Sequence, residues 1–291
     1  MLGLFQIGGN TASQKSRRIG RKQYFKGCER LNLIITAGGT RERIDAVRTI
    51  ANEATGRLGS LIAEEFSHRL AAREHTIYYL CGAGSAVPAV EDPGIRVIRI
   101  EGTRQLQEKL SGLLTTQRID AVIHSMAVSD YKVRSITTPE LIAEGMAEKF
   151  QNLQAAPSRE DWINMVRETI TEYSLAGEKK ISSELENPVL VLEKTPKIIG
   201  MIKKLSPRTA LVGFKLLSGV DEGKLIDTAY QLLLKNECDF VLANDTDSIR
   251  KGNHEGYLID AGANFIKYSG KENIAKGIVD KLLKESSEGS N

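Results

Sequence analysis

Residues 33–66, LIITAGGTRERIDAVRTIANEATGRLGSLIAEEF, carry the pattern that decides the fold. A short apolar run ends in Gly38 and Gly39, and after a polar turn a second glycine pair, Gly56 and Gly59, leads into an amphipathic helical pattern. Glycine lets the backbone approach a ligand without a Cβ in the way, and the free amides of a helix N-terminus attract anions. The stretch therefore predicts a strand, a phosphate-binding turn and a helix, in an order that is neither a P-loop nor GxGxxG.

Elsewhere, apolar runs alternate with helical periods. The runs that predict strands are residues 31–36, 76–81, 95–100, 121–125, 189–193, 210–216 and 240–243. Helical spacing appears over residues 58–70, 106–114, 225–233 and 274–282, and Thr195 followed by Pro196 predicts a helix start that continues through Ile202. Because most runs are continuous, both faces of the sheet are expected to be covered. The sequence predicts an α/β, Rossmann-like, doubly wound and mostly parallel sheet.

Two segments depart from this alternation. Residues 132–187 contain no convincing strand, only helical patterns around 141–150 and 162–170, and an excursion of this length at the carboxyl edge of a sheet is typical of a lid. Residues 254–270 have apolar stretches on either side of Gly262 and Asn264. They predict a C-terminal β-hairpin, an antiparallel appendage available to a partner subunit.

Composition bounds the class of protein. The 291 residues, 41% of them hydrophobic and 26% charged, are typical of a soluble globular protein, and no apolar run approaches the roughly 18 to 20 residues that span a membrane. The net charge of +3 owes much to the basic residues between Lys15 and Lys26. Residues 1–30 are therefore expected to be a disordered basic leader, with a transit peptide or a nucleic-acid arm as alternatives, and residues 31–291 a single domain.

The cysteines and histidines predict no structural metal site. Cys28, Cys81 and Cys238 are too widely spaced for a disulfide framework or a zinc knuckle, and no pair of histidines has HxxxH or HxH spacing. A reducing compartment, the cytoplasm, is the expected location.

The ligand of an open α/β sheet lies beyond the carboxyl ends of the strands. The residues that follow the apolar runs are polar and suited to phosphate groups: Gly38, Gly39 and Thr40; Met126 to Tyr131; Phe214 and Lys215; and Asn244, Asp245 and Thr246. The stretch GAGSAV at 82–87 imitates a dinucleotide fingerprint, but Pro88, Pro93 and Gly94 stand where its helix should follow.

Taken in order, ITAGGTRERIDAVRTIANEATGRLG, AVSDY, KISS, EKTPKII, VGFKL and LANDT resemble phosphopantothenoylcysteine synthetase, the phosphopantothenate–cysteine ligase of coenzyme A biosynthesis. The resemblance implies a cytoplasmic homodimer with CTP, or else ATP, as co-substrate and Mg²⁺ on the nucleotide phosphates. The carboxylate of 4'-phosphopantothenate would form an acyl nucleotide, an acyl cytidylate with CTP, that L-cysteine then captures. A monofunctional form is expected, because thirty residues before Leu31 cannot fold a flavin-dependent decarboxylase domain.

The resemblance also implies roles for single residues. Asn52 and Lys180 would be catalytic, Asn52 on the acyl nucleotide and Lys180 on the triphosphate charge, and Arg48 and Asn52 would bind the substrate. Where several family members carry further lysines after Lys180, this chain has Ser182 and Ser183. The implied nucleotide-binding residues are Gly38, Gly39, Gly56, Gly59, Met126, Ala127, Asp130, Pro196, Lys197, Ile198, Ile199, Phe214, Lys235 and Asn244.

Plainer interpretations stay open for these residues. Lys180 would be a solvated loop charge, Asp130 and Asn244 turn formers at strand ends, Phe214 a core residue and Asn52 a helix cap. Two other functions are also open: an NAD(P)-binding oxidoreductase that uses GAGSAV, and a non-catalytic module that binds a nucleotide, or nucleic acid through the leader. The ligase interpretation expects neither nucleic acid nor a membrane as a partner.

Overall fold

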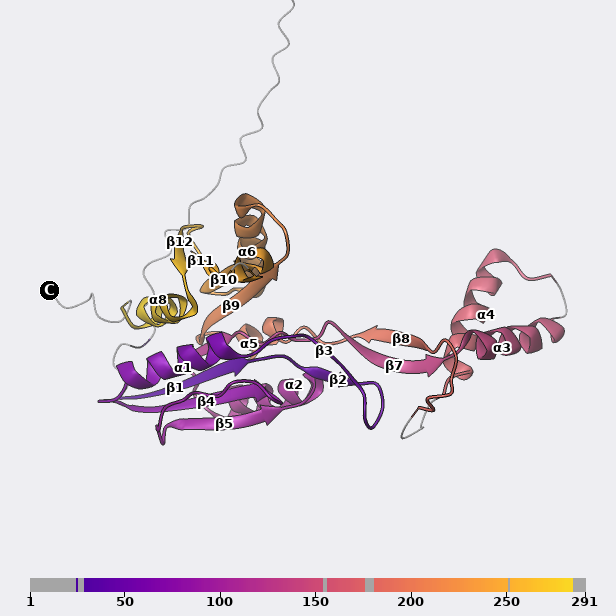
Figure 1. The fold of residues 1–291 in the computed structure, drawn as a ribbon, viewed down its shortest axis with the longest axis horizontal. Coiled ribbons are helices and arrows are strands. Elements are labelled where there is room, and N and C mark those ends of the chain that lie inside the picture. The colour runs from indigo at the N-terminus through magenta and orange to yellow at the C-terminus, as the bar shows by residue number, and fades with distance from the viewer. Residues whose placement is uncertain (1–24, 26–28, 154–155, 176–180, 251, 285–291) are drawn as a thin grey trace, which may run out of the picture.

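The computed structural model describes residues 25, 29–153, 156–175, 181–250 and 252–284. Its centre is an eight-stranded sheet with the order β12-β11-β10-β9-β6-β1-β4-β5 (Figure 1). The strands are β1 (Arg30–Ala37), β4 (Glu74–Gly82), β5 (Ile95–Ile100), β6 (Ala121–His124), β9 (Ala210–Leu217), β10 (Phe240–Asp245), β11 (Glu255–Asp260) and β12 (Phe265–Ser269). In this sheet β5, β4, β1, β6, β9 and β10 are parallel to one another. β11 and β12 add the predicted antiparallel hairpin. The predicted Rossmann-like fold is confirmed.

The strand order reverses between β1 and β6. From β1 the chain first winds outward to β4 and β5, and it then returns to the other side of β1 and continues through β6, β9 and β10. Such a reversal is where open α/β sheets bind their ligands. Here the pairing continues past the strands, because Gly39 bridges to Ala127. Residues 38–40 after β1 and 125–130 after β6 are called the switch-point loops below.

Helices cover both faces of this sheet. The helices are α1 (Arg57–Arg69) and α8 (Lys271–Lys284) on one face, and α2 (Thr103–Thr116), α5 (Ile199–Leu205) and α6 (Glu222–Asn236) on the other, with the short α7 (Thr246–Arg250) after β10. Leu33 and Ile35 of β1 pack in the core with α1 and α8, and Ile34 packs in the opposite core. Successive side chains of a strand point to opposite faces, so the continuous apolar run of β1 is buried on both sides.

The fold begins before the predicted boundary at residue 30. Phe25 is 2% exposed and belongs to the core that contains α1 and α8, and Arg30 is the first residue of β1. The rest of the predicted leader, apart from Glu29, lies outside the described residues.

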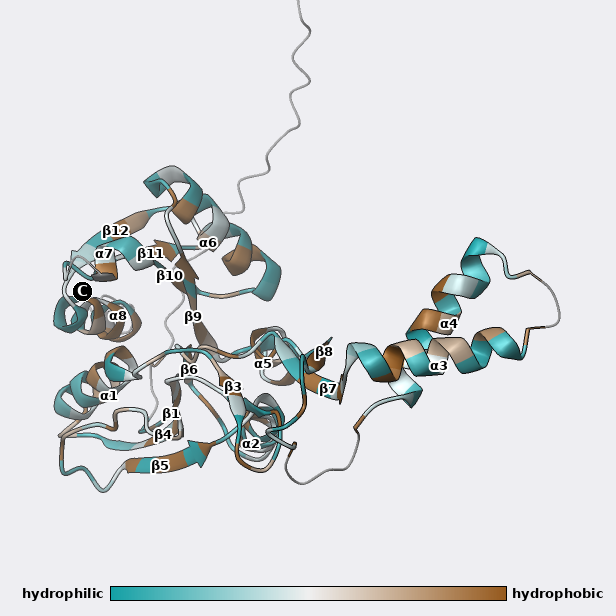
Figure 2. Cartoon of the chain, turned by 45° about the vertical axis from the view of Figure 1, so that its right-hand side comes forward, coloured by the Kyte–Doolittle hydropathy of each residue, from teal (hydrophilic) through white to brown (hydrophobic). Residues whose placement is uncertain are grey.

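Residues 131–194 form a projection that we call the arm. It contains an antiparallel pair, β7 (Tyr131–Thr137) and β8 (Val189–Lys194), and two helices, α3 (Pro139–Gln151) and α4 (Arg159–Glu172). Figures 1 and 2 show the arm extending from the body, with α3 and α4 at its far end and not over the sheet. The two predicted helical patterns are confirmed.

Two expectations about the arm are wrong. Residues 132–187 were expected to contain no strand, yet β7 begins at Tyr131 and runs to Thr137. The apolar run at 189–193 is a strand, but it pairs with β7 in a separate two-stranded sheet and does not enter the main sheet. The run looks like a buried strand because it is continuous and apolar, although Leu192 is 46% exposed.

Local sequence signals set the ends of the arm helices. Thr138 caps α3 through its side chain with Pro139 as the first helical residue, and Ser158 and Asp161 form a capping box at the start of α4. The two helices then pack together, with the rings of Phe150 and Trp162 stacked 6.0 Å apart.

Candidate functional site

Two glycines at the switch point bring three loops together. Gly38 has φ 78° and Gly56 has φ 73°, a left-handed conformation that suits glycine. A Cβ on Gly38 would collide with Ser85, and one on Gly56 would lie 3.0 Å from the Ser85 Cβ and 3.1 Å from the Gly38 nitrogen. Gly56 is also the N-cap of α1 and supplies no side-chain cap. The two glycines therefore let the loops after β1 and β4 pack closely against the N-terminus of α1. The free amides of a helix N-terminus suit an anion such as phosphate.

Asn52 joins this cluster from a small hairpin made of β2 (Arg41–Arg43) and β3 (Thr49–Ala51). Its Nδ2 donates to the carbonyl oxygen of Ala127 over 3.4 Å. The same oxygen accepts from the Thr40 amide at 3.2 Å, and the Ala127 amide donates to Gly38 at 2.8 Å. Asn52 is therefore held between the switch-point loops and is not the cap of α1.

Asp130 and Lys197 meet at the same edge. Their carboxylate and ammonium groups lie 2.5 Å apart, and both side chains are largely exposed. The Thr195 amide donates to the Asp130 carbonyl at 3.0 Å, and the Thr195 hydroxyl donates to the Ser129 carbonyl. The prediction that Thr195 and Pro196 start a helix is therefore wrong. Thr195 instead binds the loop after β6, and α5 begins at Ile199.

A buried polar pair links the ends of β1 and β6. The Thr36 hydroxyl accepts from the Met126 amide at 3.3 Å and lies 2.9 Å from Nδ1 of His124. Either atom of the Thr36–His124 pair can be the donor, according to the tautomer of the imidazole. Burial lowers the pKa of His124 to about 4, so the ring is neutral near pH 7. Sequence reasoning missed this pair, although both residues close apolar runs.

A second buried chain of polar groups supports the loops from below. Ser129 donates its amide to the Thr40 hydroxyl at 2.9 Å, and that hydroxyl donates to the Ser129 oxygen at 3.0 Å. Glu42 accepts from both the amide and the hydroxyl of Thr103 at the start of α2. These satisfied bonds order the loops before any ligand arrives.

Arg48 lies on the same small hairpin and contacts the arm at Ile181. Its Nη2 lies 3.5 Å from the carbonyl oxygen of Ile181, the first described residue after Lys180. Lys180 itself lies outside the described residues, so its placement stays a prediction.

Three further predicted nucleotide-binding residues lie on β9, β10 and α6. Phe214 follows Gly213, which pairs with His124, so it lies beside the loop after β6 and packs partly buried against the core with α1 and α8. Asn244 is 7% exposed and donates to the Glu255 carbonyl at 2.8 Å, so its amide holds β11. Lys235 is in the last turn of α6, where the Oδ1 of the adjacent Asn236 lies 3.4 Å from the Cβ position of Gly200.

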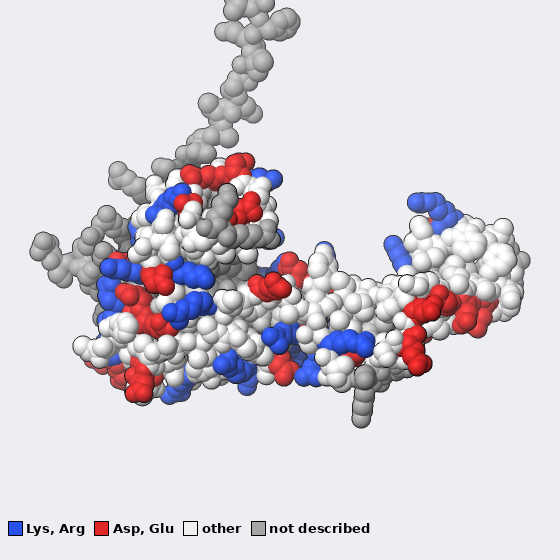
Figure 3. All heavy atoms as spheres, in the orientation of Figure 1, with Lys and Arg blue, Asp and Glu red and all other residues white. Residues whose placement is uncertain are grey.

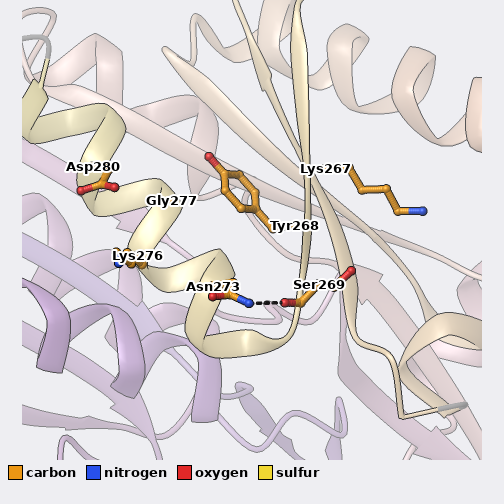
Figure 4. Close-up of a pocket in the computed structure, with 7 residues that line it drawn as sticks. All are labelled: Lys267, Tyr268, Ser269, Asn273, Lys276, Gly277 and Asp280. Atoms are coloured by element: carbon orange, nitrogen blue, oxygen red, sulfur yellow. Dashed lines mark hydrogen bonds between the residues drawn. The ribbon is translucent and has the colours of Figure 1, made fainter.

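A cavity of about 320 Å³ lies elsewhere, between β12 and α8 (Figure 4). Tyr268, Asn273 and Asp280 are among the residues that line it, and no predicted site residue does. Figure 4 shows Lys267 and Tyr268 on opposite sides of β12. Among the residues that the structure describes, no cluster of three or more His, Cys, Asp or Glu side chains is placed to hold a metal ion. No described helix is long and apolar enough to cross a membrane.

The GAGSAV stretch does not open a helix. β4 ends at Gly82, Ser85 is buried against Gly38 and Gly56, and residues 83–94 contain no helix before β5 begins at Ile95. A dinucleotide fingerprint needs the helix N-terminus that is absent here. The oxidoreductase interpretation therefore lacks its binding element.

The reversed strand order and the helices on both faces of the sheet define a Rossmann-like α/β protein. The comparison with known families specifies this further. The DNA/pantothenate metabolism flavoprotein C-terminal domain matches residues 28–154 and 147–285, and the chain belongs to this family.

Known relatives share the family across most of this chain. A coenzyme A biosynthesis bifunctional protein CoaBC from Thermococcus kodakarensis is 30% identical over 250 residues, which is 86% of this chain and 49% of that protein. Its counterpart from Methanocaldococcus jannaschii is 26% identical over 259 residues, 87% of this chain and 50% of that protein. The chain thus spans about half the length of these curated relatives.

Solved structures agree with the fold. The DNA/pantothenate metabolism flavoprotein from Streptococcus pneumoniae has a TM-score of 0.68 and 30% identity, and the match covers 87% of this chain and 99% of that one. A Cab2 variant in complex with phosphopantothenate-cysteine has a TM-score of 0.58 at 15% identity, over 90% of this chain and 89% of that one. The second likeness shows the shared fold alone.

Proposed function

We propose that this protein is a phosphopantothenate–cysteine ligase that forms 4'-phosphopantothenoylcysteine through an acyl nucleotide. The observation that carries the proposal is the position of Asn52, within hydrogen-bond distance of the Ala127 carbonyl and packed against Gly39, in the chain segment that leads to the N-terminus of α1. An amide donor next to an anion-binding backbone suits an acyl phosphate ester, whose carbonyl and phosphate both need neutral or positive partners. The relatives named for coenzyme A biosynthesis support the same chemistry.

The proposed reaction has two bond-exchange steps. A carboxylate oxygen of 4'-phosphopantothenate bonds to the α-phosphorus of the triphosphate, the bond to the β-phosphate oxygen breaks, and pyrophosphate leaves. The cysteine amine then bonds to the acyl carbon, loses a proton, and releases the nucleoside monophosphate. Mg²⁺ would neutralise phosphate charge and would be held by the phosphates, since the described residues contain no acidic cluster for it.

The chain's own residues would orient the two substrates. The backbone at Gly38, Gly56 and the start of α1 would bind phosphate oxygens, and Asn52 would donate to the acyl carbonyl as charge develops on it. Asp130 and Lys197 would border the nucleotide, because their ion pair joins the switch-point loop to the segment before α5.

The first test offers CTP and ATP separately with phosphopantothenate. We expect pyrophosphate release before cysteine is added, faster with CTP, and amide product only after cysteine is present. A folded protein that releases pyrophosphate with neither triphosphate would contradict the proposal.

Asn52→Ala tests the proposed role of Asn52 as a donor to the acyl carbonyl. Removal of one donor to a developing oxyanion costs about 100- to 1000-fold in kcat, so amide formation should fall by that order. Asn273→Ala is the matched control, because Asn273 also donates to a backbone carbonyl, that of Ser269, far from the switch point. Lys180→Gln should instead slow pyrophosphate release; a defect limited to the cysteine step would reject that role.

We further propose that two copies associate through the arm. A two-stranded sheet is marginally stable alone, and β8 exposes Val189, Leu190 and Leu192. Figure 3 shows acidic and basic side chains interspersed over the body, whereas much of the visible arm carries neither. A second arm, with the same apolar surface, would cover these residues.

The C-terminal hairpin offers a control for this interface. Phe265 and Ile266 of β12 are exposed at an open edge of the main sheet, where the sequence also predicted a partner. In sedimentation experiments, Leu190→Ser with Leu192→Ser should yield monomers, while Phe265→Ser with Ile266→Ser should leave the dimer intact. The reverse outcome would move the interface to the hairpin.

Deletion of residues 1–24 separates the ligase from a nucleic-acid-binding module. The deletion ends before Phe25 because that side chain belongs to the core. Unchanged ligation with no change in nucleic-acid affinity is expected; lost nucleic-acid binding would favour the module.

A further inference from the structure

Asp45 lies in the turn between β2 and β3, yet its side chain is only 1% exposed. Its Oδ1 accepts from the amides of Val47 at 2.8 Å and Arg48 at 2.7 Å. These bonds shape the turn, which the Ile44 amide closes by donating to the Arg48 carbonyl at 2.9 Å. One oxygen of the carboxylate is enough for this purpose.

The other oxygen binds a segment 136 residues away in the chain. Asp45 Oδ2 accepts from the Ile181 amide at 3.3 Å and lies 3.6 Å from Nη1 of Arg48. Nη2 of Arg48 lies 3.5 Å from the Ile181 carbonyl oxygen. Asp45 and Arg48 therefore hold the two peptide groups of Ile181 between them.

Burial makes this contact specific. Ile181 is 4% exposed, so its side chain is packed where Asp45 and Arg48 bind its backbone. A buried carboxylate is costly unless its oxygens are satisfied, and hydrogen bonds to a charged acceptor are stronger than neutral ones. The turn bonds satisfy Oδ1, and the Ile181 amide gives Oδ2 its hydrogen bond; loss of that bond would leave Oδ2 with only its longer contact to Arg48.

We propose that Asp45 is a positioning residue that fastens the backbone at Ile181 to the hairpin that carries Arg48 and precedes Asn52. The inference rests on the proposed ligase function, which assigns Arg48 and Asn52 to the substrate. Asp45 does not itself touch the reacting atoms. It orients the Arg48 guanidinium and fixes the backbone at Ile181.

Asp45→Asn separates the two jobs of the carboxylate. The amide oxygen can still accept from Val47 and Arg48, so the turn is kept, but an NH₂ group replaces the oxygen that faces Ile181. Asp45→Ser is a second variant, because one hydroxyl can serve the turn and no second acceptor remains. Asp92→Asn is the matched control: Asp92 shapes a turn by accepting from Gly94 at 2.8 Å and pairs with His75, away from the switch point.

Two measurements test the variants: hydrogen exchange on the protein without ligand, and kcat during turnover. Hydrogen exchange at the Ile181 amide should become about ten times faster in both Asp45 variants and stay unchanged in Asp92→Asn. The kcat for pyrophosphate release should fall by roughly 10- to 100-fold, as expected when a substrate-binding group shifts by about 1 Å. Circular dichroism should remain that of the wild type.

The outcomes are distinct. Unchanged exchange at Ile181 overturns the contact, and faster exchange with a normal kcat overturns the positioning role. If the wild-type protein forms no product, the ligase proposal and the positioning role fall together, while exchange still shows whether Asp45 binds this segment.

Discussion

The body and the arm use similar apolar runs with opposite results. In the body, Ile34 and Ile35 of β1 are fully buried because helices cover both faces of the sheet. In the arm, Leu190 and Leu192 of β8 stay exposed because only β7 pairs with them. An apolar run therefore predicts a strand, and its neighbours decide whether that strand is buried. The arm differs from the body in a second way, because we propose that a second copy of the chain covers its exposed apolar residues.

The largest expected effect contrasts a core residue with an arm residue. Phe66→Ala removes a fully buried ring between α1 and the sheet and should cost about 3 to 5 kcal/mol in the free energy of unfolding. Leu192→Ala, from an exposed position, should cost less than about 1 kcal/mol when measured on the monomer. Urea titrations at low protein concentration give both values; equal losses would mean that the arm is as tightly packed as the body.

A smaller effect is expected from the buried pair Thr36 and His124 of the body, as a dependence of the free energy of unfolding on pH. Below pH 6.5 the histidine of the unfolded chain takes up a proton, but folded His124 does so only near pH 4. Protonation therefore favours the unfolded state, and stability falls as the pH drops through this window, by about 2 kcal/mol at pH 5 and roughly 3 kcal/mol at pH 4.

His124→Asn isolates this contribution. Its amide oxygen can still accept from the Thr36 hydroxyl, but the side chain does not titrate. The stability difference between the wild type and this variant should shrink by about 2 kcal/mol between pH 7.5 and pH 5, measured by denaturant titration. A constant difference would show that folding does not lower the pKa of His124.

Helix caps in the arm and in the body allow a comparison of how the two regions unfold, with a smaller expected effect. Ser158→Ala removes the cap of α4 in the arm, and Asp221→Ala removes the cap of α6 in the body; each should cost about 1 kcal/mol. Hydrogen exchange should rise only in α3 and α4 for the first variant, and in the slowest-exchanging body strands for the second. Global loosening by Ser158→Ala would show that the arm and body unfold together.

The strands of the body could be predicted because burial on both faces leaves a continuous apolar run, as in β1 and β4. β7 could not, since its buried residues come only at Ile136 and Thr137 and its other positions are polar or partly exposed. β2 and β3 are three residues long, too short for any period to show.

The site was partly predictable for a similar reason. Gly38 and Asp130 follow apolar runs, and fold rules place such positions at one edge of the sheet. Asn52 was expected there from the family resemblance alone. Asp45 and His124 act through hydrogen bonds to Ile181 and Thr36, residues distant in sequence. Pairings of that kind depend on tertiary packing, although the spacing of Asp45 and Val47 is typical of a side-chain turn.

The smallest expected effect lies on the arm surface. Lys132 and Glu193 form a cross-strand ion pair of 2.9 Å between β7 and β8, and both side chains are more than two-fifths exposed. Glu193→Gln should change stability by less than about 1 kcal/mol, and the change should vanish in high salt. A larger, salt-independent loss would indicate that a partner covers this pair.

One isotope experiment tests the central claim, that the switch-point loops activate a carboxylate as an acyl nucleotide. Phosphopantothenate labelled with ¹⁸O in its carboxylate is turned over with triphosphate and cysteine, and the products are analysed by mass spectrometry. The account predicts one ¹⁸O atom in the nucleoside monophosphate and none in pyrophosphate. Unlabelled monophosphate, or ¹⁸O in released phosphate, would contradict it.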